Sequence, residues 1–86
     1  MNVKATEQVA QLFENFGVLY FLPPPEAKYI EAIQAELSEQ KWGVARLKEA
    51  LDMLKYSKEY NDSARFGRYP TIYEIMDADW EAHKGI

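Results

Sequence analysis

Side chains that commonly perform catalysis or bind metal ions are sparse in this chain. It contains one histidine, His83, and no cysteine, so disulfides and thiolate metal sites are excluded. Asp79 precedes His83 by one helical turn and Asp77 is close to both. A metal site needs a fuller set of ligands at suitable spacing. We therefore interpret these three residues as the polar end of a helix.

Motifs of enzyme active sites are also missing from the sequence. It has no glycine-rich phosphate loop, no nucleophile elbow and no Cys–His pair. Carboxylates occur in pairs, but nothing in the pattern points to a cleft that would raise the pKa of one partner. We expect a protein that is not an enzyme, with no catalytic residues, no metal site and no cofactor.

The strongest candidate for binding chemistry is a short run in which arginines and aromatic residues alternate. Arginine and tyrosine are enriched at the energetic centres of protein interfaces, and aromatic rings also stack on single-stranded nucleic acid. A third interpretation is that the aromatic rings pin a loop to the core and the arginines are solvated. The predicted partner-binding set consists of Arg65, Phe66, Arg68, Tyr69 and Tyr73.

The charge distribution limits the choice of partner. The net charge is −4, with −4 on residues 1–40, +3 on residues 41–68 and −3 on residues 69–86. A dedicated nucleic-acid binder usually has a strongly basic face, whereas the basic centre here is modest. Protein binding is therefore preferred over direct nucleic-acid binding.

Four amphipathic helices must position these residues. Apolar side chains recur with helical spacing and predict helices at about 6–16, 25–40, 44–58 and 72–82. Residues 61–68 form a polar break rich in turn-forming residues. The predicted buried stripes are Val9, Leu12, Phe13 and Phe16; Ala27, Ile30, Ile33 and Leu37; Leu47, Ala50, Leu51 and Leu54; and Ile72, Ile75, Met76 and Trp80.

Several residues mark where these helices begin and end. Thr6 is a candidate N-cap, and Gly17 suits the left-handed position that terminates a helix. Thr71 and Glu74 have the spacing of a capping box, in which each side chain satisfies a free backbone N–H group. Trp42, beside Gly43, is expected to anchor the turn between the second and third helices.

Two features connect the first and second helices. Residues 18–22 form an apolar run that we interpret as a buried connector or an extension of the first helix, because no partner strand is visible. If this run were exposed, it would be a docking patch and would favour a homodimer over a monomer. Pro23, Pro24 and Pro25 then form a stiff connector.

Length and composition set the overall class. Eighty-six residues with 48% hydrophobic content predict one domain covering residues 1–86, an all-α bundle of about four helices. No apolar run approaches the roughly 20 residues that span a bilayer, and the start lacks the apolar region of a secretory signal. We expect no membrane contact and a cytoplasmic location.

The order of helices and anchors resembles that of phage replicative-helicase loaders and loader inhibitors. The residues that carry the resemblance are Leu12, Phe13 and Phe16; Tyr29 to Leu37; Trp42; Ala50, Leu51 and Leu54; and Pro70, Thr71, Ile72, Glu74 and Ile75. They span about residues 9–76. Proteins of this family commonly have a longer C-terminal tail that contacts the helicase, whereas this chain ends at Ile86, so no tail residue is assigned a role.

The resemblance implies a small non-enzymatic adaptor that binds a replicative DNA helicase and either loads or inhibits it in a bacterial host. Two alternatives remain open. The first is an acidic inhibitor acting by protein binding or nucleic-acid mimicry, which requires one continuous negative face. The second is a single-strand binder whose affinity falls steeply with salt. The acids of the first alternative are Glu31, Glu36, Glu39, Asp77, Asp79 and Glu81.

Overall fold

The computed structural model describes residues 3–64 and 67–84, and within these ranges all regular structure is helical. This confirms the predicted all-α fold, with five helices where about four were expected. The helices are α1 (Val3–Val18), α2 (Ala27–Glu39), α3 (Val44–Lys55), α4 (Lys58–Ala64) and α5 (Ile72–His83).

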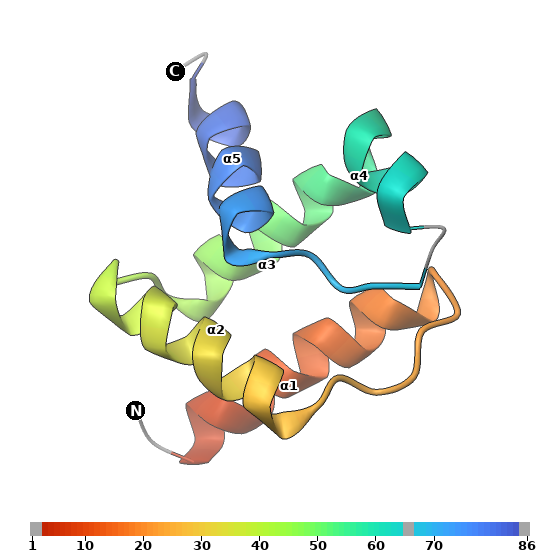
Figure 1. Ribbon diagram of the computed structural model, residues 1–86. Helices are drawn as coiled ribbons and strands as arrows, with labels where there is room; N and C mark the ends of the chain where they lie inside the picture. Colours follow the sequence, from red (N-terminus) through yellow and green to blue (C-terminus); the bar gives the residue numbers. More distant parts are fainter. Residues whose placement is uncertain (1–2, 65–66, 85–86) are drawn as a thin grey trace.

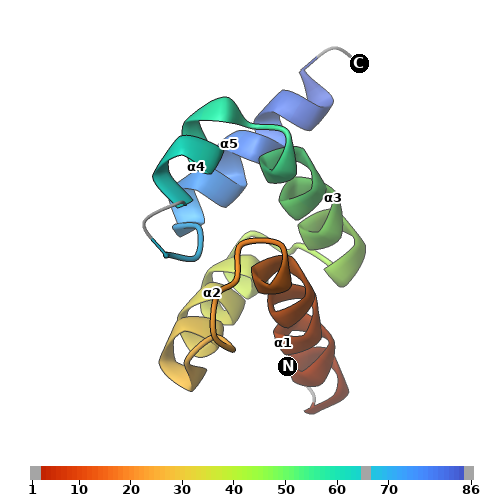
Figure 2. The ribbon, with the colours of Figure 1, turned by 90° about the vertical axis from the view of Figure 1, so that its right-hand side faces the viewer.

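Helix α3 is the centre of the arrangement. It makes its most extensive contacts with α5 and smaller contacts with α1 and α4, while α1 also packs against α2. Figure 2 shows α1 and α2 in one half of the molecule and α3, α4 and α5 in the other. The molecule is flattened, with principal extents of 35 × 34 × 16 Å, and the carboxyl end of α5 points away from the body (Figure 1).

The core is built from the apolar stripes of the helices, largely as their spacing predicts. Ala27 is an exception because it is exposed at the start of α2, and Trp80 is another because its ring is 62% exposed. Tyr60 was not predicted, yet it is buried among the stripes. The buried set is Val9, Phe13, Phe16, Ile30, Ile33, Leu37, Leu47, Ala50, Leu51, Leu54, Tyr60, Ile75 and Ala78.

The boundary predicted at the end of the third helix is wrong. Helix α3 ends at Lys55 and a separate helix, α4, begins at Lys58, so much of the predicted polar break is helical. A break at Tyr56 and Ser57 lets the chain change direction, and Asn61 stabilises it by donating from its side-chain amide to the carbonyl oxygens of Lys55 and Ser57. The change of direction allows Tyr60 to enter the core.

The predicted helix ends have mixed outcomes. The capping box at Thr71 and Glu74 is confirmed, with both reciprocal hydrogen bonds present. Thr6 does not cap α1, which begins at Val3. Gly17 does not take the left-handed C′ position either, since it lies within α1. A larger residue has no room at this position because Tyr69 packs against it: an added Cβ would lie 2.9 Å from Cζ of the Tyr69 ring.

The left-handed position after α1 is occupied by Phe21, whose φ is +56°. The amides of Leu22 and Phe21 donate to the carbonyl oxygens of Gly17 and Val18, which is the hydrogen-bond pattern of a Schellman motif. Lys41, with φ of +59°, occupies the same position after α2. Glycine is the usual residue at this position because a Cβ makes left-handed backbone costly.

The expectation that residues 18–22 are buried is wrong for most of the segment. Val18 continues α1, as one form of the prediction allowed, but its side chain is exposed. Leu19 is also exposed and Phe21 is 96% exposed, whereas Tyr20 and Leu22 are partly buried. Tyr20 packs on Phe16 at a ring distance of 5.1 Å. Of its five apolar side chains, two are therefore partly buried and three are in solvent.

Candidate partner-binding site

Arg68, one of the predicted binding residues, forms a bidentate ion pair with Glu74. Its Nη1 and Nη2 donate to the two carboxylate oxygens at 2.6 and 2.7 Å. The guanidinium also lies over the ring of Tyr60, 5.5 Å from its centroid. Hydrogen bonds from Arg68 lower the pKa of the Glu74 carboxyl. Since Glu74 also caps α5 through Thr71, this ion pair ties the segment before α5 to the start of the helix.

Tyr69 is also engaged within the molecule. Its hydroxyl donates to the carbonyl oxygen of Pro23 at 2.7 Å, and its ring lies 5.5 Å from that of Tyr29. Tyr29 in turn donates to the carbonyl oxygen of Pro70 at 2.8 Å. These contacts hold the segment before α5 against the proline connector. Burial raises the pKa of both Tyr29 and Tyr69.

Among the other predicted binding residues, the structure describes Tyr73. Tyr73 lies on α5 and is 76% exposed. Arg65 and Phe66 lie outside the described residues. The structure therefore leaves Tyr73 accessible, while the side chains of Arg68 and Tyr69 make internal contacts.

A second ion pair joins α3 to α5. Arg46 donates to both carboxylate oxygens of Asp79 at 2.9 and 2.7 Å, and these hydrogen bonds lower the pKa of this buried carboxyl. The Arg46 guanidinium also stacks on Trp42 at 4.6 Å. His83 Nε2 lies 3.4 Å from Asp79 and 3.7 Å from Glu49. Asp79 thus holds α5 against α3 through Arg46, a role that the sequence pattern did not indicate.

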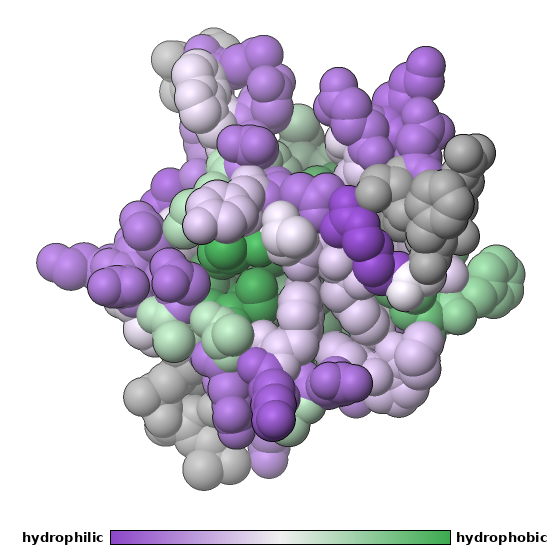
Figure 3. Space-filling view, viewed as in Figure 1, coloured by the Kyte–Doolittle hydropathy of each residue, from purple (hydrophilic) through white to green (hydrophobic). Residues whose placement is uncertain are grey.

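Besides Tyr73, the described residues form two surfaces suited to contact with a partner. The first, called the Phe21 corner here, consists of Val18, Leu19 and Phe21, all exposed at the end of α1. In Figure 3 most of the visible face is hydrophilic, and hydrophobic side chains project at its edge where α1 ends. Large apolar side chains grouped on a surface are typical of binding sites.

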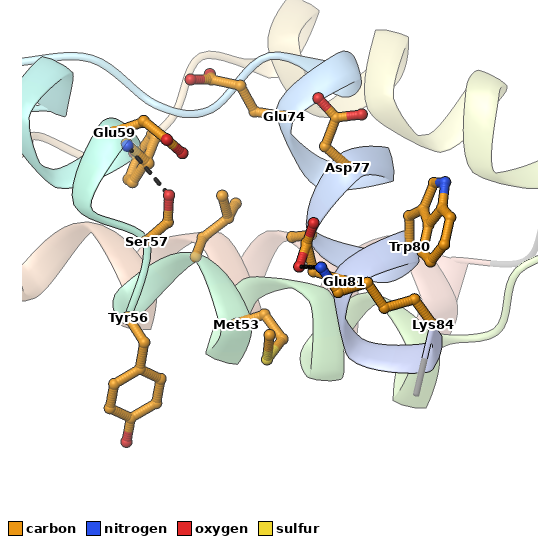
Figure 4. A pocket seen from close by; sticks show the side chains of 12 residues that line it. Met53, Tyr56, Ser57, Glu59, Glu74, Asp77, Trp80, Glu81 and Lys84 are labelled. Carbon is orange, nitrogen blue, oxygen red and sulfur yellow. Dashed lines mark hydrogen bonds and ion pairs between the residues drawn. The ribbon is translucent and has the colours of Figure 1, made fainter. Parts of the chain in front are cut away.

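The second surface is an open groove of about 720 Å³ between the end of α3, the start of α4 and α5. We call it the α3–α5 groove. Its apolar lining includes the aliphatic side chains of Met53, Leu54 and Ala78 and the aromatic rings of Tyr56, Tyr60 and Trp80. Figure 4 shows Glu59 on α4 and Asp77 on α5, both above Met53 in this view. The sequence pattern did not indicate the groove, because it depends on the break between α3 and α4.

The remaining chemistry of the described residues is limited. Within residues 3–64 and 67–84, no three His, Cys, Asp or Glu side chains are arranged to hold a metal ion. No helix in this part of the chain has the length and apolarity required to cross a bilayer.

In comparisons with known proteins, no family model matches the chain, and neither does any curated protein or solved structure.

Proposed function

We propose that this protein is a small non-enzymatic adaptor that binds a DNA-replication protein, and that its partner is a replicative DNA helicase. The observation that carries the binding role is the exposure of large apolar side chains on so small a domain, with Phe21 at 96% and Tyr73 at 76%. Leaving such side chains in water forgoes the free energy that their burial would contribute. A partner that covers them recovers that free energy.

The class of partner comes from the resemblance to phage helicase loaders and loader inhibitors. In that role the adaptor would act in the cytoplasm of a bacterial host by occupying a surface of the helicase. Its own contribution is a rigid scaffold, in which the Arg46–Asp79 and Arg68–Glu74 pairs hold α5 on α3 and fix the segment before α5. Exposed residues on this scaffold are presented in a fixed geometry, which lowers the entropic cost of binding.

The experiment is capture of purified bacterial replicative helicases by the immobilised protein. We expect retention of a helicase, weakened at least tenfold by Phe21→Ser or Tyr73→Ala. Both side chains are exposed, so the fold should be retained, and circular dichroism checks this. Failure to retain any helicase, with the immobilised protein folded, would refute the helicase assignment.

The predicted binding run that contains Arg65 and Arg68, called the arginine loop here, needs a separate variant. Arg68→Ala would remove the ion pair with Glu74 and so confuse binding with stability, whereas Arg65→Ala is tested by itself. If the loop contacts the helicase, Arg65→Ala weakens capture; unchanged capture removes Arg65 from the mechanism. Binding of single-stranded DNA at two salt concentrations tests the alternative, since phosphate contacts require a steep loss of affinity with salt.

A further inference from the structure

We infer that the α3–α5 groove is the docking site for a basic amphipathic segment of a partner protein, an inference that rests on the proposed adaptor function. The segment would place an apolar side chain over Met53 and lysine or arginine side chains beside Glu59 and Asp77. This assigns to the groove a partner segment with positive charge.

The apolar part of the groove arises from the path of the chain. Helix α3 ends at Lys55 and α4 begins at Lys58. Because α3 does not continue past Lys55, the surface between its end and α5 stays open. Met53 is only partly buried there, whereas Leu54 and Ala78, which also line the groove, are buried. Methionine is common in grooves that accept helices because its flexible, polarisable side chain adapts to different partners. An apolar side chain of a partner can therefore be buried at this point.

The charges around the groove select the partner. Its lining contains four carboxylates and one lysine among the described residues. Glu74 is already paired with Arg68, and Glu81 with Lys84 at 2.7 Å. Their charges are largely compensated within the molecule.

Glu59 and Asp77 are different. Both are exposed, and neither forms an ion pair with another described residue. Their side chains come from α4 and α5, and Figure 4 shows both of them above Met53 in this view. Two uncompensated carboxylates beside an apolar surface attract cationic partners and repel phosphate, because complementary charge sets which partners are accepted. A basic protein segment therefore fits the groove, and a nucleic acid does not.

Exposed aromatic side chains of the lining enlarge the contact surface. Tyr56 is 86% exposed at the break between α3 and α4, and Trp80 is exposed on α5. Figure 4 shows them on opposite sides of Met53. Aromatic residues are enriched in protein interfaces, and tryptophan and tyrosine rings also attract lysine and arginine side chains. Both rings can thus flank a bound cationic segment.

The experiment is an NMR titration of the whole protein with a synthetic 16-residue amphipathic helix of leucine and lysine. A peptide with glutamate in place of lysine serves as the control ligand. We expect saturable shifts confined to residues around the groove with the basic peptide, and none with the acidic one. Shifts centred elsewhere, or produced equally by single-stranded DNA, would overturn the inference.

Two variants with the same change in net charge distinguish binding at the groove from nonspecific electrostatic attraction to the whole protein. Glu59→Lys/Asp77→Lys reverses the charge of the groove and should raise the Kd for the basic peptide at least tenfold. Glu31→Lys/Glu39→Lys makes the same change on exposed positions of α2 and should alter Kd less than threefold. Equal weakening by both variants would show that the groove is not selective.

A second pair of variants tests the apolar part of the groove. Trp80→Ala should weaken peptide binding about fivefold, while Phe21→Ala, which removes an exposed ring outside the groove, should leave it unchanged. Helicase capture then separates the two proposals. Capture unaffected by Glu59→Lys/Asp77→Lys would overturn the groove as the partner site but leave the adaptor role. Peptide binding in the groove without helicase capture would retain the groove and refute the helicase assignment.

Discussion

The ring of Tyr69 lies against the Cα of Gly17, so closely that an added Cβ would come 2.9 Å from Cζ and closer still to the hydroxyl oxygen. The ring cannot retreat easily, because its hydroxyl donates to Pro23 and its other neighbours include Tyr29. This contact joins α1 to the segment that leads into α5. It explains a glycine in the last turn of a helix, where alanine would otherwise be favoured.

The first prediction concerns this contact. Gly17→Ala should lower the free energy of unfolding by about 1–3 kcal/mol, because overpacking forces the ring or the helix to shift. Gly43→Ala is the control, since an added Cβ there meets nothing within 4 Å, and it should cost only about 0.5 kcal/mol at the N-cap. Urea unfolding measures both. In a Tyr69→Phe background the Gly17→Ala penalty should shrink; an unchanged penalty would refute the clash.

The second prediction concerns the strained residue after α1. Phe21→Gly should raise the free energy of unfolding by about 1 kcal/mol, because glycine adopts the left-handed conformation without the Cβ penalty. Phe21→Ala should leave stability nearly unchanged, because it removes only an exposed ring and retains a Cβ. Thermal unfolding followed by circular dichroism makes the comparison. Equal stabilisation by alanine and glycine would show that the ring, and not the backbone, sets the cost.

The third prediction concerns association. We predict that the exposed Phe21 corner pairs two copies of the chain, because a homodimer would bury Val18, Leu19 and Phe21. Sedimentation equilibrium should then detect a dimer whose dissociation constant rises at least tenfold in Val18→Ser/Phe21→Ser. Tyr73→Ser, on α5, is the control and should leave the dimer intact. A wild-type protein that is monomeric at millimolar concentration would contradict this prediction.

The fourth prediction concerns acid. Hydrogen bonds from Arg46 and Arg68 lower the pKa values of Asp79 and Glu74 in the folded state. The unfolded chain therefore binds more protons in this range, and the stability from these pairs is present above about pH 5 and lost as pH falls below about 4. Asp79→Asn should cost about 1–2 kcal/mol at pH 7 and much less at pH 2.5.

The control for acid unfolding is Glu31→Gln, an exposed position on α2 that should change stability by less than about 0.5 kcal/mol at either pH. Urea unfolding at pH 7 and at pH 2.5 measures each variant. An Asp79→Asn penalty that stays constant between the two pH values would show that the ion pair does not contribute as its geometry indicates.

The helical stripes were largely predictable because each depends on local spacing. Phe13, Leu47 and Ile75 are fully buried at positions set by the period of the helix. The capping box at Thr71 was predictable for the same reason, since its partners are three residues apart. The break between α3 and α4 was not predictable in this way. The sequence pattern predicted one helix through about residue 58, whereas α3 ends at Lys55 and α4 begins at Lys58.

The candidate site was less predictable. Arg68 and Tyr69 have the composition of an interface loop, but Glu74, Tyr60 and Pro23 occupy their polar groups. The type of a residue indicates which groups its side chain can bind, but it does not indicate which of these groups lies nearest in the folded protein. Exposure of the Phe21 corner was equally hidden, because an apolar run carries the same pattern whether it faces core or solvent.

The sequence by itself determined the all-α class, the buried stripes and the start of α5, because these follow from contacts within one or two helical turns. Only the tertiary structure decided why Gly17 is a glycine, which carboxylates are neutralised and where the α3–α5 groove opens. Those features join residues far apart in the chain, as Arg46 and Asp79 do. Such residues become neighbours only when the helices pack together, so their pairing depends on the tertiary structure.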